Sequence, residues 1–266
     1  MSNSCEICAL VDDLSRVATM REAGAARIYL DVIDIDTSDE TMRLLERDGI
    51  VPVLDEVCRE GDHARLDSWV RSGRCVAVGS VSELTLARER GAVAEVRGCI
   101  PAHNVAALRT LAAMGARFAW LSPELSLAQA CELASFDELP VGVTVYGRPR
   151  LMTCEHCVLQ VSCDCDHDHE HCKRRLEPRW LVNIDDRALP VRTDARGRSR
   201  VYLDEPVDLT PRAAELARGG VSRLLVDARL ASDDEARGAI ARLHRALSGE
   251  VVPCEGLPGL SDCGVE

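Results

Sequence analysis

One repeating unit runs along most of the first half of the chain and limits the folds open to it. A short aliphatic run is followed by an amphipathic stretch and then by a glycine. The aliphatic runs read CEICALV, ARIYLDVI, IVPVL, RCVAVG, VAEVR, ARFAWLS and PVGVTVY. The stretches between them have helical periodicity, as in Val105, Leu108, Leu111, Ala112 and Met114. Alternating strands and helices predict a parallel sheet with right-handed crossovers.

The expected helices carry end signals. Glycines stand where a helix C-terminus needs a left-handed residue, at Gly24, Gly49, Gly73, Gly91 and Gly115. The expected N-caps are Asp13, Ser82 and Ser126. These signals place the helix boundaries between the aliphatic runs.

The number of expected strands predicts that the sheet closes into a barrel. Residues 1–150 hold the first seven strand–helix units, and residues 210–250 add an eighth strand, Arg223–Asp227, with helices around Pro211–Arg218 and over Asp233–Leu247. Eight such strands predict a (β/α)8 TIM-like barrel. The alternative is an open doubly wound α/β sheet. Residues 251–266 are expected to form a loose tail.

Two segments interrupt the pattern before the eighth strand. Residues 151–178 are rich in cysteine, and residues 179–209 contain the runs WLVNI, LPVRTD and RVYLDEP separated by turn residues. The second segment predicts a small antiparallel β insertion.

The cysteine-rich segment predicts a thiolate-bound metal. It holds Cys154, Cys157, Cys163, Cys165 and Cys172 among aspartates that would not be buried in a core. The N-terminus MSNSCEICALVDD lacks the features of a secretory signal, so we expect a cytoplasmic protein with reduced thiols. Under reducing conditions clustered cysteines favour metal binding over disulfides.

The spacing of the thiols favours iron over zinc. Structural zinc usually takes two CxxC-like turns, and only Cys154 and Cys157 form one here. Irregularly spaced thiolates suit a 4Fe–4S cluster, which offers well-separated irons. Zinc (Zn²⁺) remains the alternative because nearby histidines could replace sulfur, although they could equally lie in a solvated loop: His156, His167, His169 and His171.

Charge and composition limit the classes of binding partner and the kind of core that this chain can have. A net charge of −12 argues against a broad electrostatic contact with nucleic acid. Six basic residues lie in or just after the cysteine-rich segment and form either a local basic patch or ordinary solvated loop charges: Lys173, Arg174, Arg175, Arg196, Arg198 and Arg200. Only 3% of residues are aromatic, so the core must be aliphatic, and no apolar run reaches the length of a membrane span.

In a barrel the site is expected where strands end and loops begin. Those positions hold Asp31, Asp55, Glu56, Asn104, Ser122–Glu124 and Tyr146–Arg148. The cysteine-rich segment follows directly in the chain, and we expect a metal held there to lie over the same mouth.

Several of these positions belong to motifs that resemble a known family. The strings are LSPEL at 121–125, VYGRPRLM at 145–152, EHC at 155–157 and DRALPV at 186–191. Taken in this order they resemble the collagenase-like peptidase family U-32, over about Cys5 to Leu209. Members often carry two barrels, and this chain resembles the C-terminal one.

The resemblance implies a four-cysteine 4Fe–4S cluster and oxygen-independent hydroxylation of RNA bases or of a quinone precursor. Among the cysteines of this chain, Cys157 and Cys172 match the family's cluster ligands best. Cys172 belongs to CKRR at 172–175, which resembles the end of the family's cysteine segment. Cys163 and Cys165 are the nearest matches for the middle pair, and Cys154 is an extra sulfur. Some members carry a further cysteine within the stretch that corresponds to 192–204, and this chain has none there.

The sequence therefore predicts an iron–sulfur protein that acts as a hydroxylase or as an accessory subunit. RNA or a small aromatic molecule is the expected substrate, and a partner subunit or upstream barrel is the expected protein partner. Glu124 is the candidate catalytic group for moving a proton and Arg148 for pairing with an anion, with Asn104 and Tyr146 as candidate substrate-binding residues. The alternatives are a collagenase-like peptidase, although no HExxH or nucleophile elbow is present, and a non-catalytic zinc-stabilised module.

Overall fold

The computed structural model describes residues 5–161, 165 and 167–259. The chain divides into two compact units: residues 1–147 with 208–266 form the barrel unit, and residues 148–207 form the insertion unit. No helix of the described residues is long and apolar enough to span a lipid bilayer.

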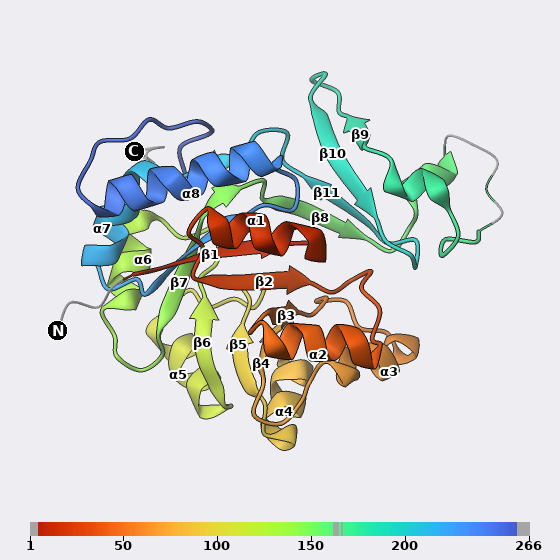
Figure 1. Cartoon of the computed structure of the whole chain (residues 1–266), viewed down its shortest axis with the longest axis horizontal. Helices are drawn as coiled ribbons and strands as arrows, with labels where there is room; N and C mark the ends of the chain where they lie inside the picture. Colours follow the sequence, from red (N-terminus) through yellow and green to blue (C-terminus); the bar gives the residue numbers. More distant parts are fainter. Residues whose placement is uncertain (1–4, 162–164, 166, 260–266) are drawn as a thin grey trace. The chain divides into compact units, whose positions relative to one another are not determined.

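The barrel unit contains a closed parallel sheet (Figure 1). Its strands, in spatial order, are β7 (Val141–Gly147), β13 (Arg223–Asp227), β1 (Glu6–Val11), β2 (Arg27–Asp31), β3 (Val51–Val53), β4 (Cys75–Val78), β5 (Val93–Val96) and β6 (Ala116–Trp120). Ala119 and Trp120 of β6 then pair with Val141 and Gly142 of β7. This pairing closes the ring, so the (β/α)8 prediction is confirmed and the open-sheet alternative is wrong.

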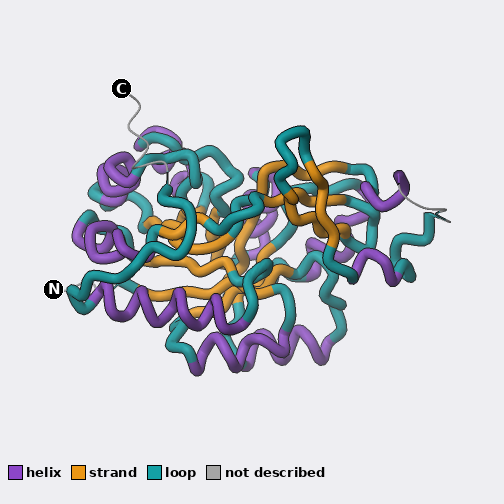
Figure 2. The backbone as a smooth tube through the Cα atoms, turned by 90° about the horizontal axis from the view of Figure 1, so that it is seen from above, coloured by secondary structure: helices purple, strands orange, loops and turns teal. Residues whose placement is uncertain are grey.

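Helices connect successive strands and cover the outside of the barrel (Figure 2). They are α1 (Val17–Glu22), α2 (Asp39–Arg47), α3 (His63–Ser68), α4 (Val81–Arg90), α5 (Val105–Ala113), α6 (Leu127–Ala134), α7 (Ala213–Arg218) and α8 (Asp233–Leu247). Short 3-10 turns precede three of them: η1 (Leu14–Arg16), η2 (Glu60–Asp62) and η5 (Thr210–Arg212). The predicted bounds of the last helix agree with α8.

Most of the predicted end signals are found. The predicted glycine caps all have positive φ, and Gly91 adopts the left-handed conformation at the C-cap of α4. Asp13 and Ser126 accept the expected N-terminal amide bonds. The prediction for Ser82 is wrong, because Ser80 caps α4 and forms a reciprocal capping box with Glu83.

Alternation along the strands divides the core into two clusters. In β1, Ile7, Ala9 and Val11 belong to the large cluster that packs against the helices, whereas Cys8 and Leu10 belong to a smaller cluster with Tyr29, Phe118 and Trp120. The smaller cluster fills the interior of the barrel. A packed interior leaves the ends of the barrel for binding.

The insertion unit is built on a four-stranded antiparallel sheet, in the order β8 (Arg150–Cys154), β11 (Ser199–Tyr202), β10 (Ala188–Thr193) and β9 (Arg179–Val182). The sequence analysis predicted three of these strands, β9, β10 and β11. It placed residues 151–154 in the cysteine-rich segment and did not predict β8, which pairs with β11 through Met152 and Val201. Two 3-10 turns, η3 (Val158–Val161) and η4 (Lys173–Leu176), lie in the cysteine-rich segment.

The chain returns to the barrel through β12 (Val207–Asp208), which pairs beside β7. The prediction of a loose tail is wrong for residues 251–259. Asp208 donates its amide to the Leu257 carbonyl at 2.9 Å and accepts the Glu255 amide through Oδ2 at 2.7 Å. Arg242 of α8 pairs with Asp208 and Glu255, so this part of the tail is held against α8.

Candidate functional site

A buried ion-pair network lies at the carboxyl ends of the barrel strands. Arg229 follows β13 and donates Nη1 to Oδ2 of Asp31, the last residue of β2, at 2.8 Å. Its Nε and Nη2 atoms bind Asp227 at 2.9 and 2.6 Å. One guanidinium therefore joins two carboxylates that lie nearly 200 residues apart in sequence.

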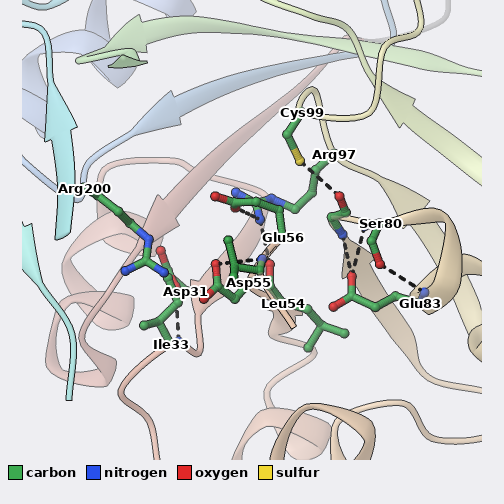
Figure 3. Close-up of polar contacts among 12 residues, drawn as sticks. Asp31, Ile33, Leu54, Asp55, Glu56, Ser80, Glu83, Arg97, Cys99 and Arg200 are labelled. Atoms are coloured by element: carbon green, nitrogen blue, oxygen red, sulfur yellow. Dashed lines mark hydrogen bonds and ion pairs between the residues drawn. The ribbon is translucent and has the colours of Figure 1, made fainter. Parts of the chain in front are cut away.

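A second arginine extends this network around the mouth. Arg97, directly after β5, donates Nη1 to the Leu54 carbonyl at 2.6 Å and lies 3.2 Å from Glu56 Oε2 (Figure 3). Burial lowers the pKa of Arg97, but the charges of Cys99 and Glu56 raise it, and the net shift is upward. The guanidinium therefore stays charged at this end of the barrel.

Glu83 is a buried acid beside the same network. Its Oε2 atom accepts the amides of Gly79 at 2.7 Å and Ser80 at 3.2 Å (Figure 3), whereas its buried Oε1 atom has no hydrogen-bond partner within the protein. Burial raises the pKa of Glu83 to about 7, and the charge of Asp55 adds to the rise. A carboxyl group with this pKa is half protonated near neutral pH, which suits proton transfer.

The acid–arginine pairs of the mouth were only partly predicted. Asp31, Asp55 and Glu56 were expected there from their positions after strands. Arg97, Arg229 and Glu83 were missed, although Arg97 and Arg229 also follow strand ends and could have been found by the same rule. Glu83 lies inside a helix, and only its capping-box position marks it in the sequence.

Two of the predicted site residues have structural contacts. Asn104 is the N-cap of α5, and its Oδ1 atom accepts the Ala107 amide at 2.9 Å. Tyr146 is only 3% exposed and belongs to the large hydrophobic cluster, with the Arg242 guanidinium 5.6 Å from the centre of its ring. Substrate binding by these two residues stays a prediction, while capping and packing are their observed roles.

The two candidate catalytic residues belong to different units. In the barrel unit Glu124 has an exposed side chain, and its Oε2 atom lies 3.6 Å from His103 Nε2. It does not cap α6, because Ser126 does so. In the insertion unit Arg148 donates Nε to the Asp204 carbonyl at 3.3 Å.

The thiols of the insertion unit accept backbone hydrogen bonds. His156 donates its amide to Cys154 Sγ at 3.4 Å, and His167, in a left-handed conformation, donates its amide to Cys165 Sγ at 3.4 Å. The sulfur of Cys157 accepts the amides of Leu159 and Gln160. These amide–sulfur bonds stabilise thiolates and occur around metal-bound cysteines.

Cys157, Cys165 and Cys172 also interact electrostatically. Burial raises the pKa of Cys157, its amide bonds lower it, and the charges of Cys165 and Cys172 raise it further. Cys163 lies outside the described residues. Within the part of the chain that is described, no three His, Cys, Asp or Glu side chains converge closely enough to hold a metal ion.

The histidines of the segment bind other polar groups. Asp168 lies 2.9 Å from His171 Nδ1, and this hydrogen bond raises the pKa of the imidazole. Gln160 Nε2 lies 3.0 Å from His167 Nδ1 and 3.5 Å from His169 Nε2. Each of these three histidines therefore already has a polar neighbour.

Two residues of the predicted basic patch are buried. Arg200 pairs with Asp194 at 3.0 Å, and both side chains are nearly inaccessible to solvent. Arg198 is also buried, and its Nε atom lies 3.3 Å from Glu155. Both interpretations of these two arginines, a basic patch and solvated loop charges, are therefore wrong, because the side chains are buried and pair inside the insertion unit.

One cysteine–histidine pair bears on the peptidase alternative. Cys58 Sγ lies 3.7 Å from His63 Nδ1, and Asp67 Oδ1 lies 3.5 Å from the same nitrogen. In a catalytic triad the nucleophile and the acid bind opposite ring nitrogens, so that one holds the ring while the other exchanges a proton. The shared nitrogen does not provide that arrangement.

Comparison with known proteins places the chain by fold alone. No family model matches the sequence, and no curated protein matches it either. A native KDPGal structure aligns over 91% of this chain and 94% of its own, with 9% identity and a TM-score of 0.52. A designed cube-shaped porous protein cage aligns over 92% of this chain and 73% of its own, with 9% identity and a TM-score of 0.52. These likenesses agree with the (β/α)8 barrel.

Proposed function

We propose that this chain is an iron–sulfur protein that works as an oxygen-independent hydroxylase, or as its accessory subunit, on RNA or a small aromatic substrate. The observation that carries the proposal is the set of backbone amides that donate to the sulfurs of two proposed ligands, Cys157 and Cys165. The U-32 resemblance supplies the reaction class.

The donor set suits an iron–sulfur cluster by its chemistry. Cys157, Cys165 and Cys172 are the described ligands of the proposal, and Cys163 is the fourth by sequence. Thiolates are the ligands that such clusters take, and amide bonds to their sulfurs tune the reduction potential. Three of the four histidines, His167, His169 and His171, contact Gln160 or Asp168, which favours sulfur over mixed sulfur–nitrogen ligation. When bound, the cluster would supply one-electron redox chemistry.

The barrel mouth is the proposed substrate site. Arg97 and Arg229 are held by carboxylates, so their orientation is set before a substrate arrives. Planar guanidiniums suit carboxylate, phosphate or aromatic groups, all of which occur in the proposed substrates. Glu83 is the group best placed to hold or release a proton there, whereas Glu124 is exposed to solvent.

The first experiment measures the metal. Protein purified without oxygen should be brown and contain about four irons and four sulfides per chain. Replacing Cys157 or Cys172 with serine should remove most of the iron. Cys254→Ser, outside the insertion unit, should leave the iron unchanged. Stoichiometric zinc with no sulfide would instead support the zinc-stabilised module, and protein without any metal would contradict both.

The second experiment tests the reaction. Nucleosides from RNA, and quinones, are compared by mass spectrometry between cells that have and lack the protein. A hydroxylated product should disappear without it and return with the wild-type chain. Cys157→Ser should not restore the product. Glu83→Gln should restore much less of it than Glu124→Gln if the buried acid moves the proton.

A further inference from the structure

A cavity of about 450 Å³ lies at the opposite end of the barrel from the mouth. We call it the floor cavity. It lies among the starts of β1–β4, the C-terminal end of α2 and the segment after α3. Its walls include Arg21, Arg27, Met42, Glu46, Trp69, Arg71 and Arg74. All of these residues belong to the barrel unit.

The floor cavity has more guanidiniums than carboxylates to pair them. Arg71 and Arg74 share Glu46, at 2.8 and 3.2 Å. Glu6 is likewise shared, since it pairs with Arg223 at 2.9 Å and lies 3.5 Å from Arg27. A positively charged cavity in a chain with a net charge of −12 favours an anionic ligand.

Asp48, a further carboxylate of the lining, is already engaged. Arg47, which does not line the cavity, binds both of its carboxylate oxygens at 2.8 and 3.1 Å. Arg21 donates to the Asp48 backbone carbonyl. This carboxylate therefore adds little to the pairing of the cavity arginines.

Two buried donors of the lining lack hydrogen-bond partners within the protein. They are Nε of Arg27 and the indole Nε1 of Trp69, whose residue is only 2% exposed. The acceptors around the Arg27 guanidinium are distant: Glu6 at 3.5 Å, Glu95 at 3.6 Å and Cys75 at 4.0 Å. Leaving a buried donor unsatisfied is costly, and an acceptor entering the cavity would remove that cost.

We propose that the floor cavity binds a small phosphate monoester. A phosphate group offers several acceptor oxygens and negative charge, which suits a wall of arginines and an indole N–H. Met42 and Trp69 provide apolar surface for the rest of the molecule, and the volume is that of a small-molecule site. The catalytic end of a TIM barrel is the opposite one, so the ligand binds without reacting.

The test uses glycerol 2-phosphate as the monoester and inorganic phosphate as the bare anion, with sodium chloride at equal ionic strength as the control. The monoester should raise the Tm of the wild-type protein by a few degrees over chloride. It should also change the fluorescence of Trp69, and Trp69→Phe should lose that change.

Arg71→Gln combined with Arg74→Gln should weaken binding about tenfold or more, because two charge-assisted bonds are lost. Both side chains are about half exposed, so the double variant should fold, and circular dichroism checks this. The matched control is Arg109→Gln, which removes an exposed arginine paired with Glu138.

Three results would overturn the proposal. One is an equal Tm in glycerol 2-phosphate and in chloride. Another is undiminished binding by the folded double variant. The third is tighter binding of citrate than of either phosphate probe, which would assign the cavity to carboxylates. None of these results depends on the insertion unit or on its metal.

Discussion

The barrel unit and the insertion unit are stabilised in different ways. The barrel has a large cluster between sheet and helices and a smaller one inside. Among the described residues of the insertion unit, the buried apolar side chains are Cys157, Leu159, Val191, Val201 and Tyr202. The same unit exposes Leu151, Met152, Leu176, Trp180, Leu181, Val182 and Ile184. We expect a sheet with so small a core to gain from another source of stability, and the proposed metal would provide it.

Removing the proposed metal is the sharpest test of this contrast and should have the largest effect. Structural metal sites contribute on the order of 10 kcal/mol to folding. Chelation, or Cys157→Ser, should therefore open residues 148–207 to protease while the barrel keeps its cooperative thermal transition. An insertion unit that stays protease-resistant without metal would show that its small sheet suffices.

A core truncation in the barrel should have the opposite pattern. Leu224 of β13 is fully buried, so Leu224→Ala should lower the free energy of unfolding by about 2–5 kcal/mol in urea denaturation. The content of iron, bound as proposed, should not change. Leu176→Ala, at an exposed site of the insertion unit, should stay within about 0.5 kcal/mol of wild type. A similar loss of unfolding free energy in Leu224→Ala and Leu176→Ala would show that the two units do not differ in how their apolar side chains contribute to stability.

The buried acid of the barrel mouth predicts a pH dependence. Folding raises the pKa of Glu83 from 4.5 to about 7, mainly through burial, so the folded state binds its proton more tightly. The associated stability is complete below pH 4.5 and is lost as pH rises through about 7. The loss is roughly 3 kcal/mol. Glu83→Gln should remove this component from stability curves measured across that range. An unchanged slope would mean that the acid is not buried as described.

The smallest effect concerns Asn104. Asn104 is the N-cap of α5, so Asn104→Ala should lower the free energy of unfolding by about 1 kcal/mol. Asn104→Asp should leave it unchanged, because aspartate is an equally good N-cap. Thermal unfolding measures both variants. If Asn104 also binds substrate, Asn104→Asp should still reduce formation of the hydroxylated product in cells. Full stability together with full product formation would leave capping as its role.

The pattern of the sequence was enough to predict the barrel. Strand and helix periodicity, together with glycine caps such as Gly91, depends on nearby residues, and those local preferences survive in the folded chain. The errors were also local. Ser82 was chosen over Ser80 because both are good caps, and the β8 strand was hidden because its apolar residues, Leu151 and Met152, are exposed.

The candidate site was less predictable. The rule that residues after strands gather at one end correctly placed Asp31, Asp55 and Glu56 at the mouth. It also selected Tyr146, whose ring packs among the core residues. The rule says at which end of the barrel a residue lies, but not whether its side chain points toward the core or toward the mouth. For the thiols, the sequence identified Cys157, Cys165 and Cys172 by their density, and the structure added the amides that bind the sulfurs of Cys157 and Cys165.

By itself, then, the sequence determined the alternating architecture, most of the helix ends and the segment that carries the sulfur. Only the tertiary structure decided which charges meet. Arg229, after β13, reaches Asp31 of β2 although β1 lies between these two strands in the sheet, and Arg27 and Trp69 come to share one cavity although α2, β3 and α3 lie between them in the chain. The physical reason is that such contacts depend on barrel closure and on side-chain direction, which no local preference encodes.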